Sequence, residues 1–276
     1  MFGPNILGYE DVKIGLLRCI VGGNRDGDNG LSQGEGGRVN SLLLGDFGTA
    51  KSSLGEEAAK VKPNSRHVSA PHASSKTITA IVEKENENPT LKLGSIPLAR
   101  NAICSIDEID AFMLEDQSRL LDIIQKGYFD IAKQGREYRV LAPTTIMPTA
   151  NPNNGSNWSD PNNVSLDEVR IRKSLLSRFQ QVYIFKNEMK GEKRQEFTKG
   201  MSMLRKRKPH NYNFLTKYLI YASQVKVNEI EPVAEYMLDK FWEMGENINM
   251  DARKYKSEFS IAEAQAKLGL KDIIDA

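Results

Sequence analysis

Residues 45–52 read GDFGTAKS, and residues of these types at this spacing could bind a triphosphate. They follow an apolar run at 40–44 that predicts a buried strand, and they precede residues 53–60, which predict a helix. In that arrangement the loop N–H groups and the helix N-terminus point at the phosphates. Lys51 would supply a charge to the β- and γ-phosphates, and the hydroxyl of Ser52 would ligate Mg²⁺. The predicted phosphate-binding set is Gly45, Asp46, Phe47, Gly48, Thr49, Ala50, Lys51, Ser52 and Ser53.

The spacing of this loop is not the usual one, because Ala50 stands where a glycine usually precedes the lysine. A chance pattern of this kind at the start of a surface helix is the alternative interpretation. Three further elements decide between the two.

A second apolar strand, predicted at 101–106, ends in two adjacent carboxylates, Asp107 and Glu108. Neighbouring side chains at a strand end project to opposite sides, so the two carboxylates are expected to have different tasks. We expect Asp107 to hold Mg²⁺ through water and Glu108 to polarise the attacking water. A solvated acidic turn is the alternative. The apolar strand and the separation from Lys51, which leaves room for one helix and another strand, favour a nucleotide hydrolase.

The third and fourth elements are an amide at a strand end and an arginine after an apolar helix end. The strand predicted at 144–150 leads to Asn151, whose amide could contact both the γ-phosphate and the lytic water, although Asn-Pro alone is a common turn signal. The run LLSRF places Arg178 after a helix end. That arginine is either a structural ion-pair partner or a finger inserted into the phosphate site of a neighbouring subunit.

The overall composition is that of one or two globular domains. The chain has 276 residues, of which 39% are hydrophobic and 27% charged, and its formal charge of +2 does not by itself indicate a nucleic-acid binder. Its two cysteines form no metal-ligand spacing and no disulfide framework, which predicts a reducing, intracellular location. We find no apolar run of membrane-spanning length and no signal-peptide layout, so secretion is not expected.

Apolar strand candidates alternate with helical segments from about residue 40 to residue 186, which predicts an α/β sheet covered by helices. The predicted organisation is an α/β core at 1–186, a basic linker at 187–211 and an all-α lid at 212–276. The remaining strands are expected at 66–69 and 181–185, and the remaining helices at 9–20, 213–225, 232–246 and 252–268. In the lid, Phe214, Tyr218 and Tyr221 fall at helical spacing and are expected in the core.

A hairpin is predicted immediately before the strand that ends at Asn151. Residues 128–132 and 136–140 flank a short loop in which glycine supplies a positive φ, and its tip is expected to present Lys133 alone. A solvated lysine is the usual meaning of such a position. In a ring of subunits, the same lysines would line a central pore and contact a phosphate backbone without sequence preference.

The four elements, in this order, resemble the AAA+ ATPases and in particular the motor domain of the minichromosome maintenance (MCM) replicative helicases. GDFGTAKS, SIDEID, TANP and LLSRF correspond to that family's GDPGTAKS, IDEFD, AANP and LLSRFD. The opening ILGYEDVK is similar to the family's IYGHEDVK. The resemblance extends over nearly the whole chain and implies an AAA+ P-loop core with a helix-2 insert, a hairpin before the sensor strand and a small helical lid.

The resemblance also implies roles for individual residues. Ile6 and Gly8 would lie near the adenine, and Arg253, in the last helix, would act as a second sensor on a neighbour's nucleotide. Lys133 would contact DNA, and so would a lysine of the helix-2 insert at about 70–97, for which Lys76 and Lys84 are the candidates.

The chain departs from the family pattern at several positions. Phe47 replaces the proline of the phosphate loop, Gln180 replaces an acidic residue after the finger, and residues 71–74 replace a stretch that contains glycine and lysine. From the resemblance we expect this sequence to correspond to the motor alone, without the family's N-terminal domain or its C-terminal winged helix.

The sequence therefore predicts an ATP-driven hexameric DNA helicase motor that uses ATP and Mg²⁺, binds DNA and self-associates through trans-acting arginines. Other replication proteins are candidate partners, and the expected location is intracellular, in the cytoplasm or nucleoid, or in the nucleus of a eukaryote. The alternative is an AAA+ remodeller or initiator, or a non-unwinding relative, that uses ATP binding to assemble on a partner.

Overall fold

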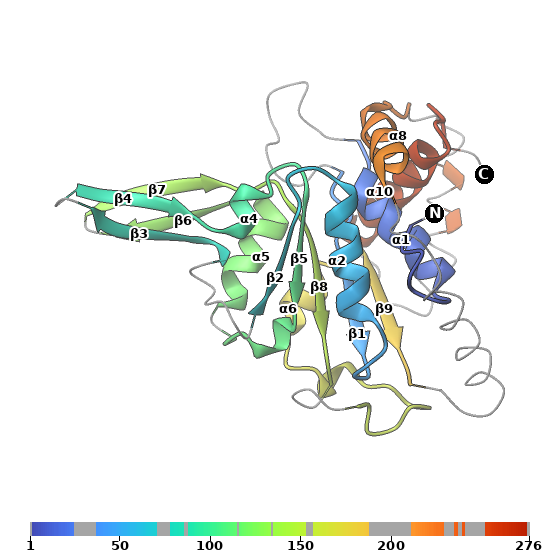
Figure 1. The fold of residues 1–276 in the computed structure, drawn as a ribbon, viewed down its shortest axis with the longest axis horizontal. Helices are drawn as coiled ribbons and strands as arrows, with labels where there is room; N and C mark the ends of the chain where they lie inside the picture. The colour runs from blue at the N-terminus through green and yellow to red at the C-terminus, as the bar shows by residue number, and fades with distance from the viewer. Residues whose placement is uncertain are drawn as a thin grey trace.

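A five-stranded parallel sheet forms the centre of the molecule, with strands in the order β2-β5-β8-β1-β9 (Figure 1). The computed structural model describes residues 2–24, 37–70, 78–85, 88–114, 116–133, 135–152, 157–187, 211–228, 235–236, 239–240 and 252–274. The sheet strands are β1 (Ser41–Gly45), β2 (Arg66–Ser69), β5 (Ile103–Asp107), β8 (Thr145–Ala150) and β9 (Gln181–Phe185). The predicted α/β fold is confirmed, and each predicted strand lies within two residues of its observed position.

Apolar side chains of the three central strands, β1, β5 and β8, are buried on both faces of the sheet. In β1, Leu42 and Leu44 belong to one hydrophobic cluster and Leu43 to the other. In β5, Cys104 and Ile106 face the same side as Leu42, as expected from the two-residue period of a strand. Two buried faces explain why these strands appear in the sequence as nearly continuous apolar runs.

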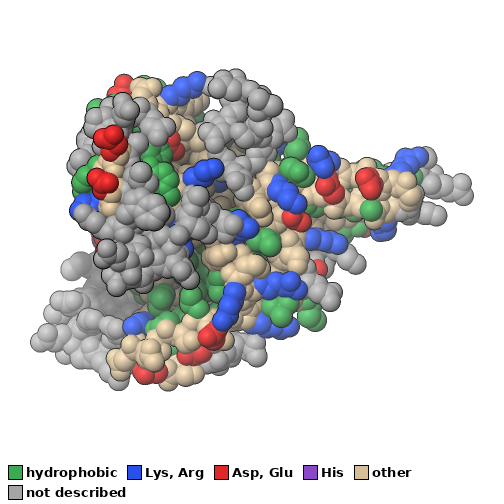
Figure 2. Space-filling model, turned by 180° about the vertical axis from the view of Figure 1, so that it is seen from behind, with side chains coloured by type: hydrophobic (Ala, Val, Ile, Leu, Met, Phe, Trp, Pro, Cys, Tyr) green, Lys and Arg blue, Asp and Glu red, His purple; other side chains and the backbone are tan. Residues whose placement is uncertain are grey.

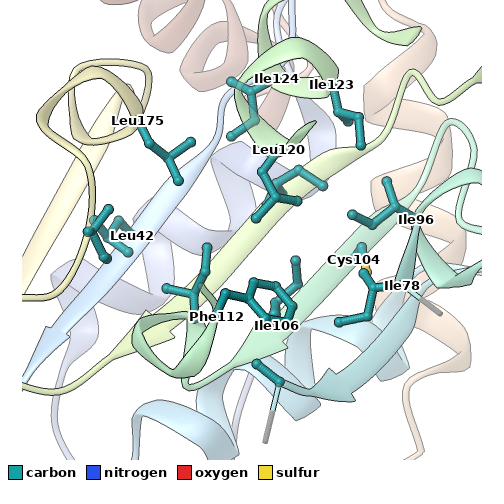
Figure 3. Packing of buried hydrophobic residues seen from close by; sticks show 14 of the residues in the cluster. Leu42, Ile78, Ile96, Cys104, Ile106, Phe112, Leu120, Ile123, Ile124 and Leu175 are labelled. Atoms are coloured by element: carbon teal, nitrogen blue, oxygen red, sulfur yellow. The ribbon is translucent and has the colours of Figure 1, made fainter. Parts of the chain in front are cut away.

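Helices cover the two faces. On one face lie α1 (Glu10–Val21), α2 (Lys51–Val61), α8 (Asn213–Gln224) and α10 (Ala252–Leu268). The other face carries α5 (Gln117–Lys126) with the short helices α4 (Ser95–Leu98) and α6 (Lys173–Leu176), and the short 3₁₀ turns η2 (Ile109–Ala111) and η3 (Leu166–Glu168) lie in the connections. Leu120, Ile123 and Ile124 of α5 belong to the same hydrophobic cluster as Cys104 and Ile106 of β5, and Figure 3 shows these side chains on one face of the sheet.

Two antiparallel hairpins form an arm that projects from the sheet (Figure 1). One hairpin consists of β3 (Ala80–Glu85) and β4 (Asn88–Leu93), within the expected helix-2 insert, and the other of β6 (Tyr128–Lys133) and β7 (Arg136–Leu141). The predicted second hairpin is confirmed, and Gly135 in its turn has a φ of +72°. Lys133 pairs with Arg136 across that turn, so two cations, rather than Lys133 alone, stand beside it.

The C-terminal helices α8 and α10 pack against α1, and α8 also contacts the end of α2. Lys267 Nζ donates to the Gly23 carbonyl at 2.8 Å, and Thr216 Oγ1 donates to the Val61 carbonyl at 2.8 Å. The predicted helices at 213–225 and 252–268 are confirmed, whereas most of 232–246 and of the basic linker lies outside the described residues. The division into core, linker and lid at these boundaries stays a prediction.

The expectation that all three lid aromatics lie in the core is wrong for two of them. Phe214 and Tyr221 are 80% and 62% exposed, while Tyr218 packs partly against the cluster that contains α1. The 3.6-residue period places these rings near one another on the helix, but α8 buries the neighbouring face, through Leu219 and Ala222. No helix among the described residues is long and apolar enough to span a membrane.

Candidate nucleotide-binding site

The predicted phosphate loop connects the end of β1 to the start of α2, and its backbone adopts conformations that favour glycine. Gly45 has a φ of +149°, and a Cβ there would lie 2.0 Å from the Phe185 carbonyl oxygen, so no side chain fits. Gly48 has a φ of +77°. Ala50 also has a positive φ, +63°, which explains why glycine is usual at this position and indicates local strain in this chain.

Lys51 is buried within this loop and contacts the loop's own oxygens. Its Nζ donates to the carbonyls of Gly45 at 2.8 Å and Asp46 at 2.6 Å, and to Thr49 Oγ1 at 3.3 Å. Burial lowers the Lys51 pKa to about 8, against an opposing effect of nearby carboxylates led by Asp107. A phosphate bound in this loop would supply a stronger partner than these carbonyls.

Ser52, Asp107, Glu108 and Thr149 form a hydrogen-bonded chain at the carboxyl ends of β5 and β8. Ser52 Oγ donates to Asp107 Oδ1 at 2.8 Å, and Thr149 Oγ1 donates to the same oxygen at 2.5 Å. The Glu108 N–H donates to Thr149 Oγ1 at 3.0 Å, and Glu108 has a φ of +57°. The structure thus brings three sequence-predicted residues together, and it adds Thr149.

Asn151 follows β8 and is buried beside Asp110. The N–H of Asn151 donates to Asp110 Oδ1 at 3.2 Å, so the predicted sensor is attached to the turn that follows Glu108. Burial raises the Asp110 pKa above its ordinary value, while the Asn151 N–H and the Lys51 charge oppose that rise. Asp110 was present in the SIDEID motif, but the sequence offered no signal for this contact.

The Asp46 carboxylate binds the backbone of two distant residues, Trp158 and Asn187, in a set of contacts called here the Asp46 clamp. These contacts were not predicted from the sequence. Both carboxylate oxygens of the buried Asp46 accept backbone N–H groups, from Trp158 at 2.7 Å and from Asn187 at 2.6 Å. The Trp158 indole donates to the Phe185 carbonyl at 3.0 Å, and that carbonyl also accepts the Asp46 N–H at 3.1 Å. The only sign of these contacts in the sequence was Trp158, a large apolar side chain in the otherwise polar segment 153–163.

The N-terminal segment that contains Ile6 and Gly8 packs near Phe185, which contacts the phosphate loop. Lys13 Nζ donates to the Ile6 carbonyl at 2.8 Å, and Gly8 has a φ of +73°. The ring of Tyr9 lies 5.0 Å from that of Phe185, centroid to centroid. Through Phe185, this segment is adjacent to the back of the phosphate loop.

Of the two candidate arginines, Arg178 does not join the site within the chain. In the parallel register Ser41 pairs with Gln181 and Gly45 with Phe185, so Arg178 lies near the opposite end of the sheet from the phosphate loop. Arg253 belongs to α10, but its side chain lies outside the described residues. A role for Arg178 at a phosphate therefore requires a second subunit.

Of the candidate DNA contacts, only Lys133 can be located. Lys133 Nζ donates to the Val82 carbonyl of β3 at 2.6 Å, which attaches one hairpin of the arm to the other. Figure 2 shows Lys and Arg side chains along the arm, interleaved with some Asp and Glu. Lys76 and the side chain of Lys84 lie outside the described residues.

The departures from the family pattern have structural counterparts. Phe47 is 68% exposed, and its N–H donates to Asn157 Oδ1 at 3.2 Å, so the aromatic ring points away from the core. The Gln180 side chain accepts the Asn40 N–H at 2.7 Å at the start of β1, which is a structural contact.

The oxygens of Ser52 and Asp107 fit a Mg²⁺ ion. Mg²⁺ is usually held by one or two protein oxygens together with water and substrate phosphates, and a hydroxyl and a carboxylate 2.8 Å apart provide such a pair. Among the described residues there is no group of three or more His, Cys, Asp or Glu side chains that could hold a metal by themselves.

Comparisons with known proteins agree with this geometry. Residues 1–203 match the family model described as MCM P-loop domain. DNA replication licensing factor mcm4-A of Xenopus laevis is 33% identical over 184 residues, which cover 66% of this chain and 21% of that protein. MCM4 of Arabidopsis thaliana is 34% identical over 185 residues, with the same coverage, and mcm7-A of Xenopus laevis is 26% identical over 289 residues, 99% of this chain and 40% of that protein. The chain thus spans well under half the length of these relatives.

Replacing Asp46 with alanine should destabilise the fold and loosen the phosphate loop. The change removes the acceptor of two backbone N–H groups, and each buried donor left unsatisfied costs about 1–3 kcal/mol. Chemical denaturation measures the loss. Asp160→Ala is the matched control, since that carboxylate accepts the Asn162 N–H at an exposed position. Equal free energies of unfolding for the two variants would contradict the clamp.

Proposed function

This chain belongs to the MCM P-loop family, and we propose that it is the ATP-hydrolysing motor of a ring-shaped replicative DNA helicase. The observation that supports the proposal most strongly is the convergence of Lys51, Ser52 and Asp107 at one edge of the sheet, joined by the contact between Ser52 and Asp107. We further propose an intracellular location, nuclear if the source is a eukaryote.

In this proposal each residue of the site has a separate task. The loop N–H groups and the Lys51 ammonium would bind the phosphates. Ser52 and Asp107 would hold a Mg²⁺ ion, which when bound supplies positive charge to the phosphates. Glu108 accepts a proton from the attacking water, which the Asn151 amide helps to orient.

The second candidate is an AAA+ remodeller or initiator that binds ATP to assemble on a partner without unwinding DNA. The lysine and arginine beside the turn of the projecting arm favour a motor that contacts a phosphate backbone. DNA-stimulated hydrolysis that depends on this arm separates the two candidates.

Glu108→Gln should preserve ATP binding and reduce hydrolysis by about 10²–10⁴-fold, because a carboxamide cannot take the proton of the water. Lys51→Ala should instead weaken nucleotide binding itself. Titrations with a fluorescent ATP analogue, run beside turnover assays, measure the two effects separately. Ordinary turnover by the glutamine variant would remove Glu108 from the proposed role.

Lys133→Ala should lower DNA affinity and leave hydrolysis without DNA largely intact. Each contacting subunit would lose about one phosphate contact, so the slope of log K against log salt should fall by roughly 0.7–0.9 per subunit. Binding titrations at several salt concentrations test this. Lys92→Ala is the matched control, because Lys92 is another exposed lysine of the arm, paired with Glu83 at 2.8 Å.

A purely structural Lys133 gives a different pattern. Loss of its bond to Val82 would lower the melting temperature, and the salt slope would stay the same as in Lys92→Ala.

Arg178→Ala should bind ATP and hydrolyse it about 10³–10⁵-fold more slowly, since a finger stabilises charge on the transferring phosphoryl group. Mixing this variant with Lys51→Ala tests whether Arg178 acts on the nucleotide of a neighbouring subunit. Some interfaces of a mixed ring would pair an intact loop with an intact arginine, so activity should partly return.

Co-assembly of the two variants must be shown by their mass in solution. If they co-assemble and no mixing ratio restores activity, Arg178 does not complete a neighbour's site, and a structural ion-pair role is favoured instead.

A further inference from the structure

Thr149 lies at the centre of the candidate site, although nothing in its residue type drew attention to it. It is the penultimate residue of β8 and is only 1% exposed. In the sheet it pairs with Leu43 of β1. On its other side Pro148 pairs with Ile106 of β5, so the next residue, Thr149, lies beside Asp107. The family pattern AANP has alanine at this position, where this chain reads TANP, so the hydroxyl is a departure of this chain from that pattern.

The Thr149 hydroxyl both accepts and donates. It accepts the Glu108 N–H at 3.0 Å and donates to Asp107 Oδ1 at 2.5 Å. A chain that runs from an N–H through a hydroxyl to a carboxylate is mutually polarised, and its charged acceptor makes the last bond a strong one. One buried side chain therefore fixes both carboxylate-bearing residues relative to β8.

The second hydroxyl on Asp107 cannot replace this contact. Ser52 Oγ also donates to Asp107 Oδ1, at 2.8 Å, but Ser52 is exposed and is itself the expected ligand of Mg²⁺. The terminal torsion of an aspartate is broad, so a carboxylate held by Ser52 alone would be free to rotate. Thr149 supplies a donor that is anchored in the sheet and takes no part in binding the metal.

The backbone of Glu108 adds a second constraint. Its φ of +57° lies in the left-handed region, which is unfavourable for a residue with a side chain and needs support from its surroundings. The bond from the Glu108 N–H to Thr149 is one such support, and it sets where the Glu108 side chain departs from the strand.

We propose that Thr149 is a positioning residue, which orients Asp107 toward Mg²⁺ and holds the backbone of Glu108 through two hydrogen bonds of one buried hydroxyl. The proposal rests on the function proposed above, and it deepens that function by assigning the orientation of the metal-binding carboxylate to a side chain of β8.

Three substitutions at Thr149 test the role. Thr149→Val keeps the shape and removes the hydroxyl, Thr149→Ala also removes it, and Thr149→Ser retains it. The Mg²⁺ concentration that gives half-maximal binding of a fluorescent ATP analogue should rise about 10–100-fold in the valine and alanine variants, the range usual for residues that orient metal ligands. The serine variant should stay within about threefold of the wild type.

Thr144→Val is the matched control. Thr144 is buried just before the same strand, and its hydroxyl donates to the Ile96 carbonyl at 2.8 Å, far from Asp107 along β8. This variant should lower the melting temperature as Thr149→Val does, without a change in Mg²⁺ dependence.

Equal Mg²⁺ dependence in Thr149→Val and Thr144→Val would overturn the positioning role, and so would nucleotide binding by the wild type that does not respond to Mg²⁺. A wild type that binds the nucleotide with Mg²⁺ but does not hydrolyse ATP would contradict the proposed motor instead. In that case the Thr149 variants still decide the positioning role, because the readout is binding.

Discussion

The parallel alignment of β1, β5 and β8 is the constraint on which the whole candidate site depends. Because all three strands run the same way, their carboxyl ends meet at one edge of the sheet, and the residues that follow each strand converge there. Lys51, Asp107 and Asn151 are far apart in the sequence and come together for this reason alone. The apolar runs that pack the two sheet faces thus also determine where the polar chemistry occurs.

Much of the fold followed from local patterns, because burial on both faces leaves a strong apolar signal in the central strands β1, β5 and β8. The loop, the two carboxylates and the amide could be placed as well, since each follows such a strand directly. The resemblance to the MCM family then joined these pieces in the correct order. Helix α1 was predicted despite Gly15, and the structure explains that glycine: a Cβ there would lie 1.6 Å from the Tyr183 hydroxyl oxygen.

The contacts that support the site could not be predicted in the same way. The Asp46 clamp joins residues more than a hundred positions apart through backbone N–H groups, and a backbone donor has no signature in the sequence. Thr149 looks like an ordinary β-branched strand residue until its partners are known. The predicted burial of Phe214 and Tyr221 was wrong for a related reason. Helical spacing shows that side chains share a face, but it does not show which face meets the core.

The bond between Lys133 and the Val82 carbonyl gives the arm a particular thermodynamic character. An ammonium has three N–H donors, and this bond uses one of them. The other two could donate to a phosphate, so the proposed DNA contact would not require the two hairpins to separate. The bond would instead hold the Lys133 side chain in place before a strand arrives, which lowers the entropy that ordering this side chain costs on binding.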